Sequence, residues 1–389
     1  MKHKILYVID NMQYGGGERA FGQLISLLSK DKYEIDVACK PGGVFEEKII
    51  SSGASLRPVD MGSRYSPKAI LQLFSIMKKR SIDIVHSQGG RADFFTRVAA
   101  KLAGVPIIVS TIAMPVEGFD VNPLRKSVYA AFDRFSERFV DKFIVVSKAL
   151  EHALIEKHRI NKEKVVLVPN GIEVEEYRPE ERGVEHGAGG KGHGVREEFG
   201  LGNKIPLVGA IGRLVWQKGF EYLIKAIPSV AEKFPEAKIL IVGEGELEAK
   251  LKAESEKLKV RDKIIFTGFR QDIKEILSAI DILAMPSLLE GMPFVILEAM
   301  AMAKPIVATD IESITEILDN GKTGILVPPK DPDALSRAII SLLTDGDKAR
   351  QMGFKARMTV EEKFRVEVIV DRVEKVYQEL LQSLALKKR

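Results

Sequence analysis

The chain has 389 residues, of which 45% are hydrophobic and 29% are charged, with a formal net charge of +5 and one cysteine. This length exceeds one typical hydrophobic core, so we expect two domains. The mild charge gives no support for a nucleic-acid-binding protein, and the single Cys39 excludes a disulfide framework within the chain. We find no signal peptide and no apolar run long enough to cross a bilayer, so we expect a cytoplasmic protein.

The first part of the chain alternates short apolar runs with segments whose apolar residues recur at helical spacing, such as 18–29 and 91–102. The predicted strands are residues 4–10, 33–39, 83–88, 105–111, 141–147 and 164–170. Strands that are apolar almost throughout and separated by helices are typical of a parallel sheet covered on both faces. We therefore predict an α/β, Rossmann-like first domain at residues 1–172.

Residues 173–202 interrupt this alternation, because they are rich in glycine and charge and poor in apolar residues. We predict an interdomain linker or surface loop there. His186 and His193 lie in this segment without an accompanying cysteine or carboxylate pattern, which favours linker residues over metal ligands.

The alternation then restarts and predicts a second Rossmann-like domain at residues 203–364. The predicted strands are residues 206–212, 237–243, 263–268, 281–287, 304–310 and 324–329. Residues 365–389 have helical period and could dock on either domain. Two doubly wound parallel-sheet domains joined by a linker would create a cleft, and ligands of such sheets bind beyond the carboxyl ends of the strands.

Two predicted strand-to-helix loops have features that suit a phosphate. Gly15–Gly17 precede a helix, whose amino terminus offers free N–H groups to an anion, although a plain turn would look the same. The spacing of this loop does not fit a dinucleotide fingerprint, so we do not expect NAD. In the second domain, Arg213 and Lys218 bracket the loop after the first strand, and two cations beside a helix amino terminus suit a diphosphate.

Other predicted strand ends are less informative. His86 ends one strand, and a lone histidine is as readily a structural residue as a catalytic one. Gly243 ends a second strand and residues 268–270 end a third. Backbone groups there could hold a nucleoside base, but ordinary turns would have the same sequence.

Glu290 and Glu298 lie around the start of an apolar helix, with Pro293 suited to its first turn. Buried carboxylates are costly unless they are paired or hydrogen-bonded. These two could be the acid and base of a glycosidase, whose separation the sequence does not give, two structural acceptors, or groups that hold a substrate. The predicted anion site favours an activated, phosphorylated sugar as that substrate.

Residues 287–301, SLLEGMPFVILEAMA, resemble the E-x7-E motif of retaining glycosyltransferases of family 4, with Glu290 and Glu298 as its two acids. GGGERA, VPNGIE and GRLVWQKG resemble further motifs of this family, and the likeness extends along nearly the whole chain. The resemblance implies the GT-B architecture, two Rossmann-like domains facing a cleft, with the last helix crossing back to the first domain. It also implies transfer of a sugar from a UDP- or GDP-sugar to a glycan or lipid-linked acceptor, in surface polysaccharide or lipopolysaccharide synthesis at the inner face of the membrane.

Residue by residue, the resemblance implies that Arg213 and Lys218 neutralise the leaving diphosphate. It implies that Glu290 holds the hydroxyls of the transferred sugar and Glu298 those of the ribose. The predicted catalytic residues are Glu290, Arg213, Lys218 and His86. The predicted donor-binding residues are Gly16, Gly17, Gly243, Gly268, Phe269, Arg270, Gly291, Met292, Pro293, Phe294 and Glu298. The resemblance also implies that no metal or other cofactor is needed, and Asp331 and Asp333 fit a helix start better than a metal site.

The chain departs from the family pattern at two places. Family members often carry H-x-H where this chain has His86-Ser87-Gln88, and often a further histidine where it has Ile112–Met114. These differences leave open a weakly active or non-catalytic relative, and a sugar-nucleotide epimerase or phosphorylase on the same fold is the alternative enzyme. Residues 115–138 mix aromatic and basic side chains, which fits a helix packed on the sheet or an amphipathic surface for an anionic membrane.

Overall fold

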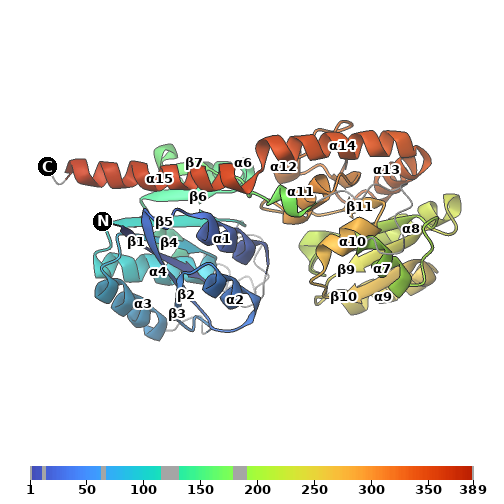
Figure 1. Ribbon diagram of the computed structural model, residues 1–389. Helices are drawn as coiled ribbons and strands as arrows, with labels where there is room; N and C mark the ends of the chain where they lie inside the picture. Colours follow the sequence, from blue (N-terminus) through green and yellow to red (C-terminus); the bar gives the residue numbers. More distant parts are fainter. Residues whose placement is uncertain (1, 11–14, 63–66, 115–130, 178–190, 388–389) are drawn as a thin grey trace. The chain divides into compact units, whose positions relative to one another are not determined.

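The computed structural model describes residues 2–10, 15–62, 67–114, 131–177 and 191–387. The chain divides into two compact units (Figure 1). Unit 1 comprises Met1–Gly171 together with Val366–Arg389, and unit 2 comprises Ile172–Arg365.

Unit 1 contains a seven-stranded parallel sheet in the order β3-β2-β1-β4-β5-β6-β7. The strands are β1 (His3–Ile9), β2 (Tyr33–Cys39), β3 (Ser55–Pro58), β4 (Ile84–Gln88), β5 (Ile107–Ile112), β6 (Lys142–Val145) and β7 (Val165–Leu167). The described helices include α1 (Gly16–Leu27), α2 (Gly43–Ser51), α3 (Pro67–Arg80), α4 (Gly90–Ala103), α6 (Lys148–His152) and α15 (Val366–Lys387), and residues 131–137 are also helical.

Both faces of this sheet are covered. Tyr7 belongs to the core beneath α1 and α15, whereas Leu6 and Val8, whose side chains point to the other face, are equally buried. Figure 1 shows α1 and α15 over one face of the sheet and α3 and α4 together over the other. Because every central strand is buried on both sides, the sequence of these strands is apolar almost throughout.

The last helix, α15, is part of the core of unit 1. Tyr377, in the middle of α15, is fully buried, and its hydroxyl lies 2.7 Å from the hydroxyl of Tyr7 in β1. Near the same turn, Glu374 accepts a hydrogen bond of 2.9 Å from Lys32 Nζ. This helix therefore joins the first 171 residues by buried packing rather than by surface contact alone.

Unit 2 contains a six-stranded parallel sheet in the order β10-β9-β8-β11-β12-β13. The strands are β8 (Leu207–Ile211), β9 (Lys238–Val242), β10 (Ile264–Gly268), β11 (Ile282–Met285), β12 (Ile306–Thr309) and β13 (Ile325–Val327). The helices are α7 (Lys191–Glu198), α8 (Phe220–Lys233), α9 (Glu248–Lys257), α10 (Ile273–Ala279), α11 (Phe294–Ala301), α12 (Glu312–Thr315), α13 (Pro332–Thr344) and α14 (Gly346–Lys363). One core cluster of this unit joins the inner residues of β8 and β9 to α8 and α13.

Part of the segment that we predicted to be a linker is folded into unit 2. Residues 191–198 form α7, which packs against α10. Arg196 is only 3% exposed; its Nε donates to Ala279 O at 2.8 Å, and its Nη2 lies 2.9 Å from Asp281 Oδ2. A single guanidinium with several buried acceptors anchors this segment in spite of its low apolar content. Residues 178–190 of the predicted linker lie outside the described residues.

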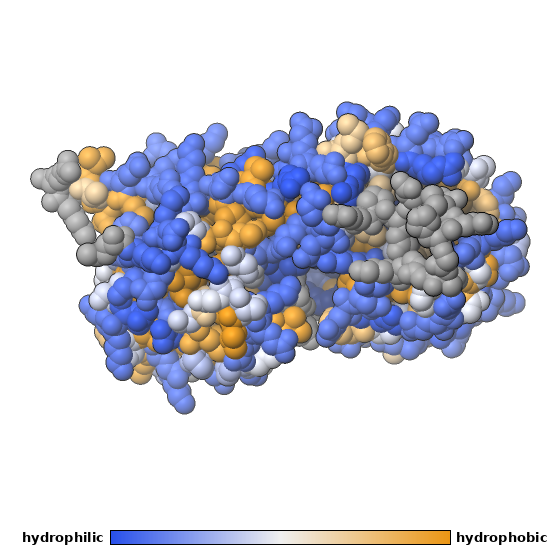
Figure 2. Space-filling model, viewed as in Figure 1, coloured by the Kyte–Doolittle hydropathy of each residue, from blue (hydrophilic) through white to orange (hydrophobic). Residues whose placement is uncertain are grey.

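The α/β class and the two doubly wound parallel sheets predicted from the sequence are confirmed. Within the residues that the structure covers, no helix has the length and apolar character needed to cross a membrane. On the face shown in Figure 2, hydrophilic residues cover most of each unit and hydrophobic residues form separate patches.

Candidate active site

The strand order of unit 2 defines where a ligand would bind. The chain passes from β8 to β9 on one side and later returns to place β11 on the other side of β8. The carboxyl ends of β8 and β11 therefore form the topological switch point, where open α/β sheets bind ligands. The loop with Arg213 and Lys218 follows β8, and the loop with Glu290 follows β11.

These two loops touch through their backbones. Leu288 N donates to Gln217 O at 2.6 Å. Gly219, which caps α8, has a φ of +61°, and a Cβ there would lie 2.1 Å from Pro286 O. Only glycine fits this close approach and this left-handed backbone. The glycine that ends GRLVWQKG thus joins the two loops tightly at the start of a helix.

Lys218 and Glu290 form an ion pair at the centre of the two loops. Lys218 Nζ lies 2.6 Å from Glu290 Oε1, and Ser287 Oγ donates to the same oxygen at 2.7 Å. Thr309, at the end of β12, donates its hydroxyl to Ser287 O. Glu290 is 6% exposed, and among the described residues its Oε2 has no hydrogen-bond partner. The carboxylate is thus held by one oxygen while the other remains able to accept.

Glu298 lies in α11 and is also buried, with 5% of its surface exposed. Tyr177 donates its hydroxyl to Glu298 Oε1 at 2.8 Å and is itself 2% exposed. The Arg357 guanidinium donates to the carbonyl oxygens of Tyr177 and Ala301, which fixes Tyr177 beside the end of α11. The two acids of the motif therefore occupy separate hydrogen-bonded environments within unit 2.

The remaining predicted donor-binding residues of unit 2 lie around these loops. Gly291–Phe294 are buried and lead into α11, with Pro293 at the N-cap rather than in the first turn. Gly243 N donates to Gly268 O at 2.8 Å, and a Cβ at Gly243 would lie 2.0 Å from Gly212 O. The ends of β8, β9 and β10 are thus brought together by glycines, and Arg213 is exposed beside them.

Phe269 and Arg270 follow the end of β10 in different environments. Phe269 is 56% exposed. The Arg270 guanidinium is paired with two carboxylates, those of Asp272 at 2.6 Å and Glu198 at 2.6 Å, and these hydrogen bonds raise its pKa. Phe269 is therefore available to a flat ligand, whereas Arg270 is occupied by carboxylates of unit 2.

In unit 1, the predicted glycine loop lies at the corresponding switch point, between β1 and β4. Helix α1 begins at Gly16, and Gly15 N donates to Glu18 Oε2 at 3.0 Å. A Cβ at Gly17 would lie 2.6 Å from Gln88 Nε2, at the end of β4. A side chain at this position would therefore have to displace the end of the Gln88 side chain.

His86 is not placed as a catalytic residue. Its side chain has no exposed surface, Nδ1 lies 2.5 Å from Tyr377 Oη, and Nε2 lies 2.7 Å from Thr111 Oγ1. Burial lowers its pKa to about 3, so the ring is neutral. We named His86 among the predicted catalytic residues, but its imidazole lies in the core beneath α15, two residues before the end of β4.

Sequence reasoning missed the residues that support the two acids. Ser287, Thr309 and Tyr177 act through hydrogen bonds that join different loops. Ser287 stands three residues before Glu290, which is the only one of these links that sequence spacing could have suggested.

Two family models match the chain. The model for Glycosyltransferase Family 4 matches residues 14–176, and the model for Glycosyl transferases group 1 matches residues 195–359. The chain belongs to glycosyltransferase family 4. Among curated relatives, this glycosyltransferase is 27% identical over 97% of both chains to the UDP-Gal:alpha-D-GlcNAc-diphosphoundecaprenol alpha-1,3-galactosyltransferase of Escherichia coli. It is 26% identical over 76% of both chains to the alpha-D-kanosaminyltransferase of Streptomyces kanamyceticus.

Solved structures show the same fold. Anabaena HepE in complex with UDP-glucose matches with a TM-score of 0.83 at 21% identity, over 97% of this glycosyltransferase and 99% of that chain. WaaG, a glycosyltransferase involved in lipopolysaccharide biosynthesis, matches with a TM-score of 0.71 at 17% identity, over 96% and 99%. The GT-B fold implied by the sequence motifs is confirmed.

Proposed function

We propose that this glycosyltransferase transfers a sugar, with retention of configuration, from a UDP- or GDP-sugar to a glycan or lipid-linked acceptor in surface polysaccharide or lipopolysaccharide synthesis. The observation that carries the proposal is the Lys218–Glu290 pair, 2.6 Å apart at the β8–β11 switch point of unit 2. A cation beside a helix start suits the diphosphate of a nucleotide sugar, and a carboxylate beside that cation suits the hydroxyls of the sugar. The E. coli relative, which carries UDP-Gal in its name, supports this class of donor.

In this proposal, Lys218 binds the diphosphate without leaving Glu290. An ammonium group has three N–H donors, and the structure occupies one of them with Glu290 Oε1. The pair is close to neutral, so the negative charge of the diphosphate calls for a second cation, and exposed Arg213 on the same loop supplies it. We propose that these two side chains, without a metal ion, neutralise the charge that develops as the sugar–phosphate bond breaks.

Glu290 Oε2 is the proposed acceptor for a hydroxyl of the transferred sugar, since it is the carboxylate oxygen without a partner among the described residues. The N–H groups at the start of α11 and Glu298 would hold the rest of the donor, with Glu298 on the ribose. The acceptor oxygen forms the new bond to the anomeric carbon, the bond from that carbon to the phosphate oxygen breaks, and the leaving phosphate helps to take the acceptor proton. Catalysis then rests on positioning and on charge stabilisation.

Calorimetric titration with UDP, GDP and their glucose, galactose and mannose conjugates tests the proposal. We expect at least one nucleotide sugar to bind, Lys218→Ala to weaken binding of the nucleotide diphosphate, and Glu290→Gln to impair transfer more than nucleotide binding. Lys322→Ala is the matched control, because Lys322 is an exposed lysine of unit 2, 66% accessible at its side chain. Failure of every nucleotide and nucleotide sugar to bind the folded protein would refute the proposal.

We also propose that unit 1 meets an anionic membrane surface through Phe132 and Phe135. These aromatic side chains are 43% and 48% exposed, and the Arg138 guanidinium stacks over the Phe135 ring at 4.0 Å. Exposed aromatic residues beside basic ones suit the boundary of an anionic bilayer. We expect the wild-type protein to co-sediment with vesicles that contain phosphatidylglycerol, and the double variant Phe132→Ser, Phe135→Ser to co-sediment less. Equal binding of the wild-type protein and the double variant to such vesicles would contradict this proposal.

A further inference from the structure

Unit 1 contains a polar hollow that the proposed donor site does not use. It lies at the carboxyl ends of β4 and β5, and we call it the β4–β5 hollow. Its polar lining consists of Gln88, Asp93, Thr111, Asp133, Glu137 and His158. Apolar residues, among them Ile112 and Leu154, form the rest of its wall. Sugar-binding pockets combine these features, since a sugar ring presents hydroxyls at its edge and C–H groups on its faces.

Gln88 is the residue that points to a ligand. Its side chain is 4% exposed, and its Oε1 is buried without a hydrogen-bond partner in the part of the chain that the structure describes. A buried amide oxygen is normally paired, so an unpaired one at the edge of a hollow calls for an explanation. Gly17 lies beside the nitrogen of the same amide. A hydroxyl of a bound molecule would satisfy this oxygen.

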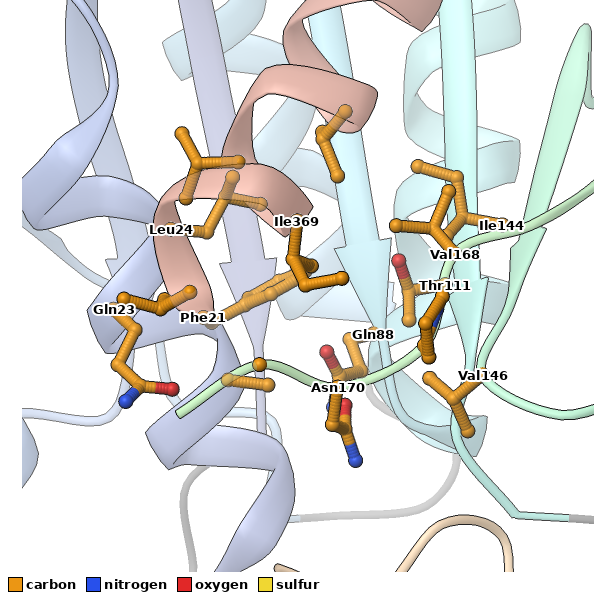
Figure 3. A pocket seen from close by; sticks show the side chains of 16 residues that line it. Phe21, Gln23, Leu24, Gln88, Thr111, Ile144, Val146, Val168, Asn170 and Ile369 are labelled. Atoms are coloured by element: carbon orange, nitrogen blue, oxygen red, sulfur yellow. The ribbon is translucent and has the colours of Figure 1, made fainter. Parts of the chain in front are cut away.

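Gln88 and Thr111 also line a neighbouring hollow of unit 1, shown in Figure 3. There, Phe21 and Leu24 from α1 and Ile369 from α15 form an apolar wall, and Gln88 and Thr111 lie at its edge. Besides Gln88 and Thr111, the amide side chains of Gln23 and Asn170 also line this hollow. The β4–β5 hollow has the larger set of polar side chains around Gln88, so we look for the partner of the amide oxygen there.

The charges of the β4–β5 hollow exclude a phosphate and favour a neutral polyol. Asp93, Asp133 and Glu137 are carboxylates, and the basic side chains beside them are each paired with one of these carboxylates, while Arg97 Nη2 has no hydrogen-bond partner among the described residues. Arg97 Nη1 lies 2.5 Å from Asp133 Oδ1, and His158 Nδ1 lies 2.5 Å from Glu137 Oε1. No cation is left over among the described lining residues for a phosphate, and the carboxylates would repel one.

Hydrogen-bond donors are present in the same hollow. Helix α4 begins at Gly90, which lines the hollow, and the first N–H groups of a helix lack partners within it. A group that both donates and accepts can use these N–H groups, the amide oxygen of Gln88 and the carboxylates together. A hydroxyl is such a group, and neighbouring hydroxyls on one ring would use several of them at once.

We propose that the β4–β5 hollow binds a neutral, hydroxyl-bearing sugar ring of the acceptor, and that Gln88 determines specificity by accepting a hydrogen bond from one of its hydroxyls. This assignment rests on the proposed glycosyl transfer, which requires an acceptor hydroxyl. Any phosphate of the acceptor binds outside the hollow.

Saturation-transfer NMR with methyl β-D-glucopyranoside, the methyl glycoside of N-acetylglucosamine and glucose 6-phosphate tests this assignment. We expect at least one neutral glycoside to bind at millimolar concentration. Gln88→Met and Gln88→Leu, which remove the acceptor oxygen, should each weaken that binding by about fivefold, as expected for one lost hydrogen bond. Gln351→Leu is the control, because Gln351 is exposed on α14 of unit 2.

The affinity for UDP, measured on the same samples, separates this proposal from the proposed function. UDP binding should be unchanged in both Gln88 variants and weakened by Lys218→Ala, whereas glycoside binding should show the opposite pattern. Unchanged glycoside binding in a Gln88 variant that still binds UDP overturns the assignment, as does the absence of binding by both neutral glycosides. Glucose 6-phosphate binding that depends on Gln88 overturns the exclusion of phosphate. Failure of the wild-type protein to bind UDP, GDP or any of their sugar conjugates counts instead against the proposed function.

Discussion

Lowering the pH from 7 to 5 tests the buried position of His86 in unit 1. Its imidazole is fully buried against Tyr377 and Thr111, and burial lowers its pKa to about 3. In the unfolded chain the pKa returns to about 6.5. Between these two values the unfolded state binds a proton that the native state does not, so stability is lost as the pH falls below 6.5 and continues to fall toward 3.

The size of the loss follows from the two pKa values. At 1.36 kcal/mol for each unit of pKa difference, proton binding to unfolded His86 lowers the free energy of unfolding by about 2 kcal/mol between pH 7 and pH 5. Asp93 acts in the opposite direction. Burial raises its pKa to about 6, so the native state takes up a proton there on acidification and gains roughly 1 kcal/mol. The wild-type protein alone would therefore show only part of the His86 effect.

A variant isolates the histidine. His86→Asn cannot titrate, and its amide can still reach toward Tyr377, while the cost of changed packing is the same at both pH values and cancels. Hydrogen exchange on peptides from β4 and α15, corrected for the chemical exchange rate at each pH, reports unit 1 directly. We expect the wild-type opening free energy to fall relative to that of the variant by about 2 kcal/mol from pH 7 to pH 5. An equal pH dependence in the two proteins would show that His86 is protonated in the native state, which contradicts its burial.

Three further predictions concern unit 2. Tyr177→Phe removes the hydroxyl that donates to Glu298 at 2.8 Å and should cost about 2 kcal/mol of stability, as measured by urea unfolding followed at Trp216, with Tyr222→Phe at a half-buried position as the control. Ser287→Ala removes one of two hydrogen-bond donors to Glu290 Oε1. It should lower kcat more than it raises KM for the nucleotide sugar, because Glu290 loses its fixed orientation while Lys218 remains. An unchanged kcat would contradict this prediction. Gly219→Ala forces a Cβ to within 2.1 Å of Pro286 O at a φ of +61°, so we expect a loss of more than 2 kcal/mol in the same unfolding assay.

Most of the fold could be predicted because the buried strands of both sheets are short and almost uniformly apolar. The predicted strand 83–88 corresponds to β4 at Ile84–Gln88, and the predicted strand 206–212 corresponds to β8 at Leu207–Ile211. Strand β3 was missed. Its residues, Ser55–Pro58, are at most half-buried at the edge of the sheet, so they lack the apolar run that marks a central strand.

Helix α7 was missed for a different reason. Its segment has few apolar residues, and two of the acceptors that bind Arg196 to unit 2 come from distant parts of the chain. A sequence pattern reports periodic apolar burial, and it does not report which remote carbonyl a guanidinium will reach.

The candidate site residues show the same limit, because their contacts join parts of the chain that are far apart in sequence. The sequence brought Lys218 and Glu290 together only through the family resemblance, whereas their shared switch point depends on the strand order. His86 shows the limit of a strand prediction, because its position in β4 does not reveal that its side chain faces the core. Gln88, at that end, is the residue with an unsatisfied buried oxygen, and it was noted in the sequence only as a departure from a family pattern.

The two switch points of this glycosyltransferase differ in charge, and that difference fits the proposal that unit 2 binds the donor and unit 1 binds the acceptor ring. In unit 2 the strand ends carry Lys218 and Arg213 beside one buried carboxylate, so an anionic group is favoured there. In unit 1 the hollow beside the corresponding switch point carries carboxylates, and its neighbouring cations are already engaged. A donor with a diphosphate would therefore be repelled from the β4–β5 hollow and attracted to unit 2. On this argument, electrostatic repulsion of the diphosphate would keep the donor out of the β4–β5 hollow, which we assign to the acceptor ring. This exclusion would not depend on contacts with the sugar of the donor.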